Sequence, residues 1–440
     1  MIAGFKVRIA LLVVLALVIP IAGMAMLQQT GAGSDKIVNE YINSQPNDPI
    51  VGLQKRLDSG QTKLEFDSRW GYLPSILREL KISPSSQTLV FSKTSFQIDH
   101  ISVQTPRALY FNDDVYVGWV QGGPVLEFGS VDPKLGAIFY TMDQKKDVPP
   151  QFDRQVEGCL VCHDSSSTGS VPGFMMRSVL PDIDGNVILS AGTSVMTDRS
   201  PLAERFGGWY ATGKSGSQYH RGNNYFPNIA SVMGNPKTYF ARTDMAATSN
   251  LETVPKIVDT SRYLGKYSDI VSLMVMTHQT QLHNIITQVS YEVRAALKDD
   301  ANNPQVPEIT QNRIRTVTEP LVKAMLFAWT PPFSAPITGV SGFTEHFEKQ
   351  GPFDKQGRSL RQFDLKTRLF RYPLSFLVYS DAFDDLPAPA RNYVYRRFRD
   401  ILSGKDRSMD FSHLSEEDRS AILQILEDTK PDFKIPEITG

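Results

Sequence analysis

The most informative stretch of this chain is Gly158-Cys159-Leu160-Val161-Cys162-His163. It contains both cysteines of the 440-residue chain, and one of the seven histidines directly follows the second cysteine. Residues i and i+3 lie on one face of a helix, so a helix through this stretch would hold the two thiols one turn apart on the same side. His163 adds an imidazole next to them.

The pattern C-x-x-C-H is the attachment signature of haem c. Thiols at this spacing can reach the two vinyl groups along one side of a haem and form thioether bonds with them. The imidazole that follows is then placed to bind the iron as its proximal ligand. We therefore predict one haem c, attached through Cys159 and Cys162, with His163 on the iron.

Three other interpretations compete with haem attachment. A zinc half-site would need two further ligands, and the chain has no second cysteine pair to supply them. A thioredoxin-like redox dithiol uses C-x-x-C but has no need of His163. A structural disulfide across two intervening residues would be unusual. Haem attachment is favoured because Cys159, Cys162 and His163 together form its signature and no second cysteine pair completes a zinc site.

The N-terminus predicts export. Lys6 and Arg8 precede an uncharged run, Ile9–Leu27, which is long enough to cross about 30 Å of hydrocarbon as a helix. Residues 1–28 are expected to be either a cleaved signal peptide or a retained membrane anchor, with a buried core helix as the third alternative. The first two place the rest of the chain in the periplasm, or at the inner membrane facing it. Bacteria attach haem c outside the cytoplasm, so the two predictions agree.

Composition limits the other functions. The chain has 46 basic and 47 acidic residues, a net charge of -1, and 41% hydrophobic residues, which is ordinary for a globular protein. A nucleic-acid-binding protein needs a basic excess on at least one face, so we expect no nucleic-acid partner.

The motif resembles the haem-binding motif of the cytochrome c family. The resemblance implies covalent haem, His163 as an axial ligand and one-electron transfer. It covers only these few residues, and the chain is several times longer than a minimal cytochrome c domain. The chain departs from the di-haem peroxidases of the cytochrome c type, which need two C-x-x-C-H motifs where this sequence has one.

The expected fold is mixed, mainly α with a smaller β-rich part, and has a cytochrome-c-like haem pocket inside an elaborated larger domain. Residues 29–145 are expected to form a helical and β-rich region, and residues 146–440 a mainly helical region that binds the haem. Two runs rich in apolar residues, 108–111 and 115–120, separated by Asn112-Asp113-Asp114, predict a β-hairpin at 108–120. An apolar stripe at helical spacing predicts a long helix over Asp269–Leu297. Ser415 followed by Asp418 is typical of a capping box.

The ligand on the other side of the iron separates the functions. His220 is the candidate distal ligand, and His278 is an alternative distal or pocket residue. Because His278 lies on the apolar stripe of the long helix, a hydrogen-bonded core histidine is its simplest explanation. Methionines, Met196 and Met233 among them, remain further alternatives.

We expect a one-electron carrier rather than an enzyme, exchanging electrons with a periplasmic or membrane redox partner protein. The alternative is a mono-haem oxidoreductase, such as a peroxidase, or a haem sensor, in which the distal iron position is open. The N-terminal helix would provide any contact with the membrane.

Overall fold

A computed structural model describes residues 40–227, 245–301, 303 and 305–434 of the chain. The chain divides into two units, residues 1–45 and residues 46–440. The predicted signal peptide or anchor at 1–28 lies outside the described residues. Among the residues described, no helix has both the length and the apolar character needed to cross a membrane.

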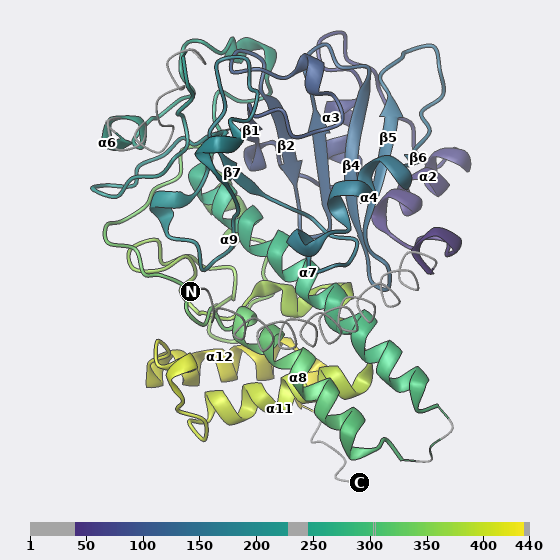
Figure 1. The fold of residues 1–440 in the computed structure, drawn as a ribbon, viewed down its shortest axis with the longest axis vertical. Helices are drawn as coiled ribbons and strands as arrows, with labels where there is room; N and C mark the ends of the chain where they lie inside the picture. Colours follow the sequence, from purple (N-terminus) through teal and green to yellow (C-terminus); the bar gives the residue numbers. More distant parts are fainter. Residues whose placement is uncertain (1–39, 228–244, 302, 304, 435–440) are drawn as a thin grey trace, which may run out of the picture. The chain divides into compact units, whose positions relative to one another are not determined.

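A seven-stranded antiparallel sheet in the order β6-β5-β4-β3-β2-β1-β9 forms the centre of the second unit (Figure 1). Its strands are β1 Thr88–Val90, β2 Arg107–Phe111, β3 Val115–Trp119, β4 Val125–Asp132, β5 Gly136–Asp143, β6 Asp153–Arg154 and β9 Trp209–Tyr210. The hairpin predicted at 108–120 is confirmed as β2 and β3. The expected boundary at residue 145 falls inside this unit, because β6 and β9 follow that residue and pair into the same sheet.

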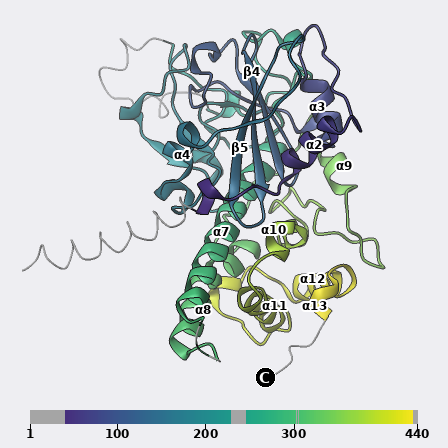
Figure 2. The ribbon, with the colours of Figure 1, turned by 90° about the vertical axis from the view of Figure 1, so that its right-hand side faces the viewer.

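Helices cover both faces of the sheet (Figure 2). The Tyr140 hydroxyl on β5 donates a 2.6 Å hydrogen bond to Asp48, the N-cap of α2 (Pro49–Asp58). The neighbouring Phe139 ring lies 4.5 Å from the ring of His163, at the end of α4 (Glu157–His163). Successive side chains of a strand point to opposite faces, so α2 and α4 lie on opposite sides of the sheet.

The long helix α7, Ile270–Asp299, confirms the helix predicted over Asp269–Leu297. It begins where the Asp269 side chain accepts hydrogen bonds from the first free backbone N–H groups, those of Val271 and Ser272. Its buried stripe packs on the same sheet face as α4, where Gln279 donates a 2.7 Å hydrogen bond to the Tyr116 hydroxyl of β3.

The C-terminal part of the chain is helical. The other α-helices and β-strands of the described residues are α3 Leu73–Glu79, β7 Arg177–Val179, β8 Thr193–Val195, α6 Met245–Thr248, α8 Glu308–Met325, α9 Phe343–Glu348, α10 Asp381–Asp384, α11 Ala388–Leu402, α12 Glu416–Thr429 and α13 Pro431–Lys434.

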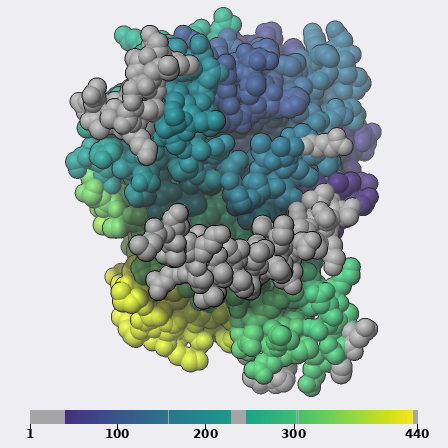
Figure 3. Space-filling view, in the orientation of Figure 1, coloured from purple at the N-terminus to yellow at the C-terminus, as the bar shows by residue number. Residues whose placement is uncertain are grey.

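The predicted capping box is confirmed, because the Ser415 and Asp418 side chains each bond the other's backbone N–H at the start of α12. In Figure 3 the blue and teal residues of the sheet region lie at one end, and the green and yellow residues of the C-terminal helices at the other.

The fold class is therefore mixed α and β, as expected at the coarse level. The sheet is larger than the predicted β-rich part, because short strands after residue 145 extend both of its edges. The described residues establish only the mixed class, and the cytochrome-c-like haem pocket stays a prediction.

Candidate functional site

The helix α4 carries the whole C-x-x-C-H motif. Cys159 is half-buried against the core, whereas Cys162 is exposed to solvent. Both are free thiols, so the structural disulfide is not found. In the part of the chain that the structure describes, no three His, Cys, Asp or Glu side chains gather in a way that could hold a metal ion.

The imidazole of His163 is held in one tautomer. Its Nδ1 atom lies 2.8 Å from the carbonyl oxygen of Gly173. A carbonyl oxygen can only accept, so Nδ1 carries the hydrogen and donates it. Burial lowers the pKa of His163, which keeps the ring neutral near pH 7. A neutral ring protonated at Nδ1 has its lone pair on Nε2, the atom that binds iron in a proximal ligand.

The long helix fixes the backbone that receives this hydrogen bond. Asn284 on α7 accepts a 2.8 Å hydrogen bond from the backbone N–H of Phe174 and donates one of 2.7 Å to its carbonyl oxygen. Gly173 is required here, because a Cβ at this position would overlap the Asn284 side chain. Asn284 of α7 therefore holds the backbone at Phe174, and the neighbouring Gly173 carbonyl orients the His163 ring.

These residues fit the group that the motif implies. The two thiols are unbonded and three positions apart on a helix, and the histidine presents an unprotonated Nε2. The outer side of α4 is open, since Val161 between the cysteines is 79% exposed. A haem c would be held by Cys159, Cys162 and His163.

An ion pair lies beside this site. Arg107 of β2 contacts Glu127 of β4, and both side chains are largely buried. Burial raises the pKa of the Cys159 thiol, and the negative charge of Glu127 raises it further. Cys159 is therefore held in the protonated, less reactive form, whereas Cys162 is open to solvent.

His220 lies at the other edge of the sheet. Its imidazole is fully buried against Phe206, and neither ring nitrogen has a hydrogen-bond partner among the residues that the structure describes. The adjoining loop is bonded to β9, through the N–H of Asn223 and the carbonyl of Trp209. Five strand spacings, a lateral distance of about 24 Å, separate β9 from β5. The His163 ring packs on Phe139 of β5. The structure does not bring His220 and His163 together.

His278 is a hydrogen-bonded core histidine. Its Nδ1 lies 2.6 Å from Oδ2 of Asp198, and its Nε2 lies 2.7 Å from Oγ of Ser375. The ring is fully buried and stacks on Phe327, with centroids 4.5 Å apart. Both nitrogens are therefore engaged within the protein, and the structure favours this role over that of an iron ligand.

Sequence reasoning missed the partners of His278, which complete an Asp–His–Ser arrangement. The distances are those of a nucleophilic triad. Ser375 is fully buried, however, so a substrate has no access to its hydroxyl. The partners lie 80 and 97 residues from His278 in the chain, and no local pattern marks them.

His283 lies nearer the motif than either expected distal residue. The Phe174 ring is 5.9 Å from the Phe139 ring on one side and 5.9 Å from the His283 ring on the other. His283 donates from Nε2 to the carbonyl oxygen of Asp113 at 2.9 Å, and its buried Nδ1 has no hydrogen-bond partner in the described part of the chain. His283 lies next to the motif because α7 packs against β5.

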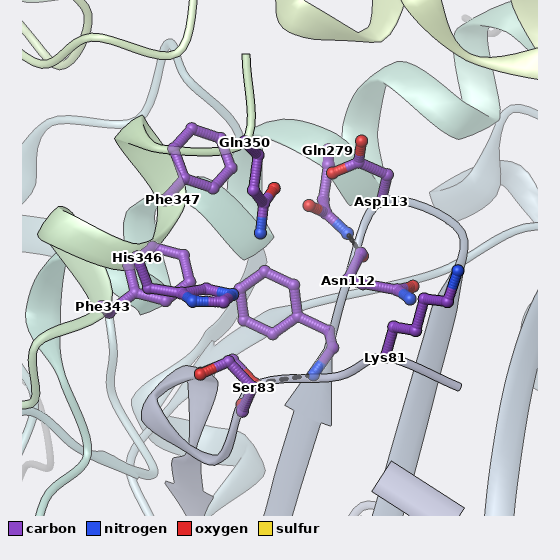
Figure 4. A pocket seen from close by; sticks show the side chains of 11 residues that line it. Lys81, Ser83, Asn112, Asp113, Gln279, Phe343, His346, Phe347 and Gln350 are labelled. Atoms are coloured by element: carbon purple, nitrogen blue, oxygen red, sulfur yellow. Dashed lines mark hydrogen bonds between the residues drawn. The ribbon is translucent and has the colours of Figure 1, made fainter. Parts of the chain in front are cut away.

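Two cavities lie elsewhere in the described structure. One of about 10 Å³, room for about one water molecule, lies between Gln279 and the aromatic side chains of Phe343 and Phe347 (Figure 4). The other, about 630 Å³, lies among α11, α12 and α13, where Arg399 and Phe433 line it. Neither is lined by a residue of the motif.

No family model, curated protein or solved structure matches this chain. Its function is therefore inferred from the chemistry of its own residues.

Proposed function

We propose that this chain is an exported c-type cytochrome that carries one haem c and transfers single electrons. Cys159 and Cys162 would anchor the haem by thioether bonds, and His163 would be its proximal ligand. The observation that carries the proposal is the hydrogen bond from Nδ1 of His163 to the carbonyl oxygen of Gly173. It leaves Nε2 with a lone pair, next to two free thiols on the same short helix.

The residues of the site have separate tasks. The hydrogen bond at Nδ1 fixes the ring and raises the basicity of Nε2. Phe139 packs on the ring and excludes water from one of its sides. Because α4 exposes Cys162 and Val161, a group attached there would lie at the surface, within reach of another protein.

When bound, haem c supplies a centre that takes up and releases one electron. The expected partner is a periplasmic or membrane redox protein. The protein would work in the periplasm, or at the inner membrane facing it if residues 1–28 are retained as an anchor.

A mono-haem oxidoreductase or haem sensor is the second candidate. One observation favours it: His278 uses both ring nitrogens within the core, and His220 lies across the sheet from His163. If no other side chain fills the distal position, a peroxide or a diatomic gas could bind there. His283, with its unpartnered Nδ1, would then be the nearest of these histidines able to exchange a proton.

The test is to express the full chain together with the bacterial haem-attachment machinery. A haem stain of the denatured protein on a gel should label the wild type and should be lost in Cys159→Ala/Cys162→Ala. Met409→Ala, a change at an exposed position, is the control. An unstained wild-type band, with a stained cytochrome produced in the same cells, would refute the proposal.

Absorption spectra with and without carbon monoxide then separate the two functions. Low-spin iron that ignores carbon monoxide supports the electron carrier. High-spin iron that binds carbon monoxide supports the oxidoreductase or sensor.

A further inference from the structure

The ion pair beside the motif bridges three strands. Arg107 on β2 reaches Glu127 on β4 by passing over Gly118 of β3, where any side chain would overlap the guanidinium group. Gln97 donates a 2.9 Å hydrogen bond to the Glu127 carboxylate. The Arg107 and Glu127 side chains are only 19% and 11% exposed, so water screens their charges poorly.

Strand register places the carboxylate close to the proximal histidine. Glu127 pairs with Thr141 and Gly129 pairs with Phe139 across β4 and β5. Glu127 and Phe139 are therefore diagonal neighbours on one face of the sheet, about 7–8 Å apart. The Phe139 ring contacts the His163 ring. Only one side chain's width separates the buried ion pair from His163.

Burying this ion pair adds little net free energy of stabilisation to the sheet. Removing two charges from water costs free energy that their attraction regains only partly. The Nε atom of Arg107 is also buried, and no described residue accepts a hydrogen bond from it. Because this desolvation cost falls on a pair that lies next to the motif, we expect the pair to have a role other than stabilising the fold.

We propose that Arg107 and Glu127 set the reduction potential of the haem held at His163, with their charges acting in opposite directions. This inference rests on the proposed function. Oxidised iron carries one more positive charge than reduced iron. The carboxylate of Glu127 favours the oxidised state and the guanidinium of Arg107 favours the reduced state, so the intact pair holds the potential between the two extremes.

The expected size of the effect follows from Coulomb's law. A unit charge about 10 Å from a redox centre, at an effective dielectric constant of about 20, would change the ratio of its oxidised to reduced form on the order of tenfold. Neutralising either Arg107 or Glu127 also leaves the charge of the other without the opposite charge beside it. Each single variant should therefore show a shift of about 59 mV, the equivalent of tenfold for one electron.

The experiment is a spectroelectrochemical titration of the purified, haem-loaded full chain. Glu127→Gln keeps an acceptor for Gln97 and should raise the potential. Arg107→Gln should lower it, and the double variant should return close to the wild type. Arg107→Lys retains the charge and should have little effect, which separates charge from shape.

Glu65→Gln is the matched control, because the Arg78–Glu65 pair has the same chemistry but is exposed to solvent. Thermal melts of each variant show whether it is folded. Shifts of the same sign in Glu127→Gln and Arg107→Gln, or shifts no larger than that of Glu65→Gln, would overturn the ion-pair proposal while leaving the cytochrome intact. A wild type without covalent haem would overturn both.

Discussion

The Nδ1 atom of His163 donates a 2.8 Å hydrogen bond to the carbonyl oxygen of Gly173, ten residues further along the chain. The backbone N–H of Gly173 in turn donates to the carbonyl of His163 at 2.9 Å. This pair of bonds closes the loop after α4 into a fixed turn. It orients the ring before any ligand binds, so the ordering cost of the ring is already met by folding.

Gly173→Ala should disturb this turn. The new Cβ would overlap the Asn284 side chain, and overpacking of this kind costs about 1–3 kcal/mol of unfolding free energy. Urea denaturation measures the loss, and the spectrum of the haem-loaded variant should show weakened proximal ligation. Gly52→Ala, where a Cβ meets nothing within 4 Å, is the control and should be neutral or stabilising. Equal stability of the two variants would contradict the proposed role of Asn284.

The two thiols of the haem-free protein should react at different rates. Burial and Glu127 raise the pKa of Cys159, so its thiolate fraction near pH 8 is smaller than that of an ordinary cysteine, whereas Cys162 is exposed. Mass spectrometry after brief treatment with iodoacetamide should find the label mainly on Cys162. Raising the pH should increase labelling of Cys159, and Glu127→Gln should increase it at fixed pH. Preferential labelling of Cys159 would count against this arrangement.

His278→Ala should destabilise the fold strongly. The change removes a fully buried ring and leaves Asp198 and Ser375 without their partner, at a cost of about 3 kcal/mol or more. Ser375→Ala loses two hydrogen bonds of its hydroxyl, with His278 and with the backbone N–H of Leu377, and should cost about 1–3 kcal/mol. His100→Ala, at an exposed position, should stay within about 0.5 kcal/mol of the wild type.

The same arrangement allows a chemical test. A fluorophosphonate probe should not label Ser375 in the folded protein, because its hydroxyl is fully buried. Labelling at Ser375 that is lost in His278→Ala would instead reveal a working nucleophile.

His220 should make the fold sensitive to acid. Burial lowers its pKa to about 4, whereas in the unfolded chain it titrates near pH 6.5. The unfolded state then binds more protons, so stability is complete above pH 6.5, falls as the pH drops and stops falling below about pH 4. The total loss is roughly 3 kcal/mol. His220→Leu should reduce the slope of unfolding free energy against pH across this window, and a slope of similar size should remain from His283, whose pKa burial also lowers to about 4.

The control for this prediction is His346→Leu, because His346 is exposed and should leave the profile unchanged. The haem spectrum of His220→Leu should also match the wild type, since His220 lies at the opposite edge of the sheet from His163. A changed spectrum would restore His220 as the distal ligand.

Local patterns in the sequence determined the elements of this protein. The three-residue spacing of Cys159 and Cys162, the capping box of Ser415 and Asp418, and the start of the long helix at Asp269 each depend on contacts within about one helical turn. Such contacts are set by backbone geometry and appear wherever the same residues recur. The hairpin of β2 and β3 follows from two short apolar runs on either side of the polar turn Asn112-Asp113-Asp114.

The tertiary structure decided what surrounds those elements. The sequence singled out His220 and His278 alike, yet among the described residues the His220 ring has no hydrogen-bond partner and the His278 ring has two. The Arg107–Glu127 pair and the Gly173 carbonyl beside His163 were not predicted either. Burial, charge and hydrogen-bond partners depend on which strands become neighbours and which helix covers them. That order comes from the packing of the whole core, and no short stretch of sequence encodes it.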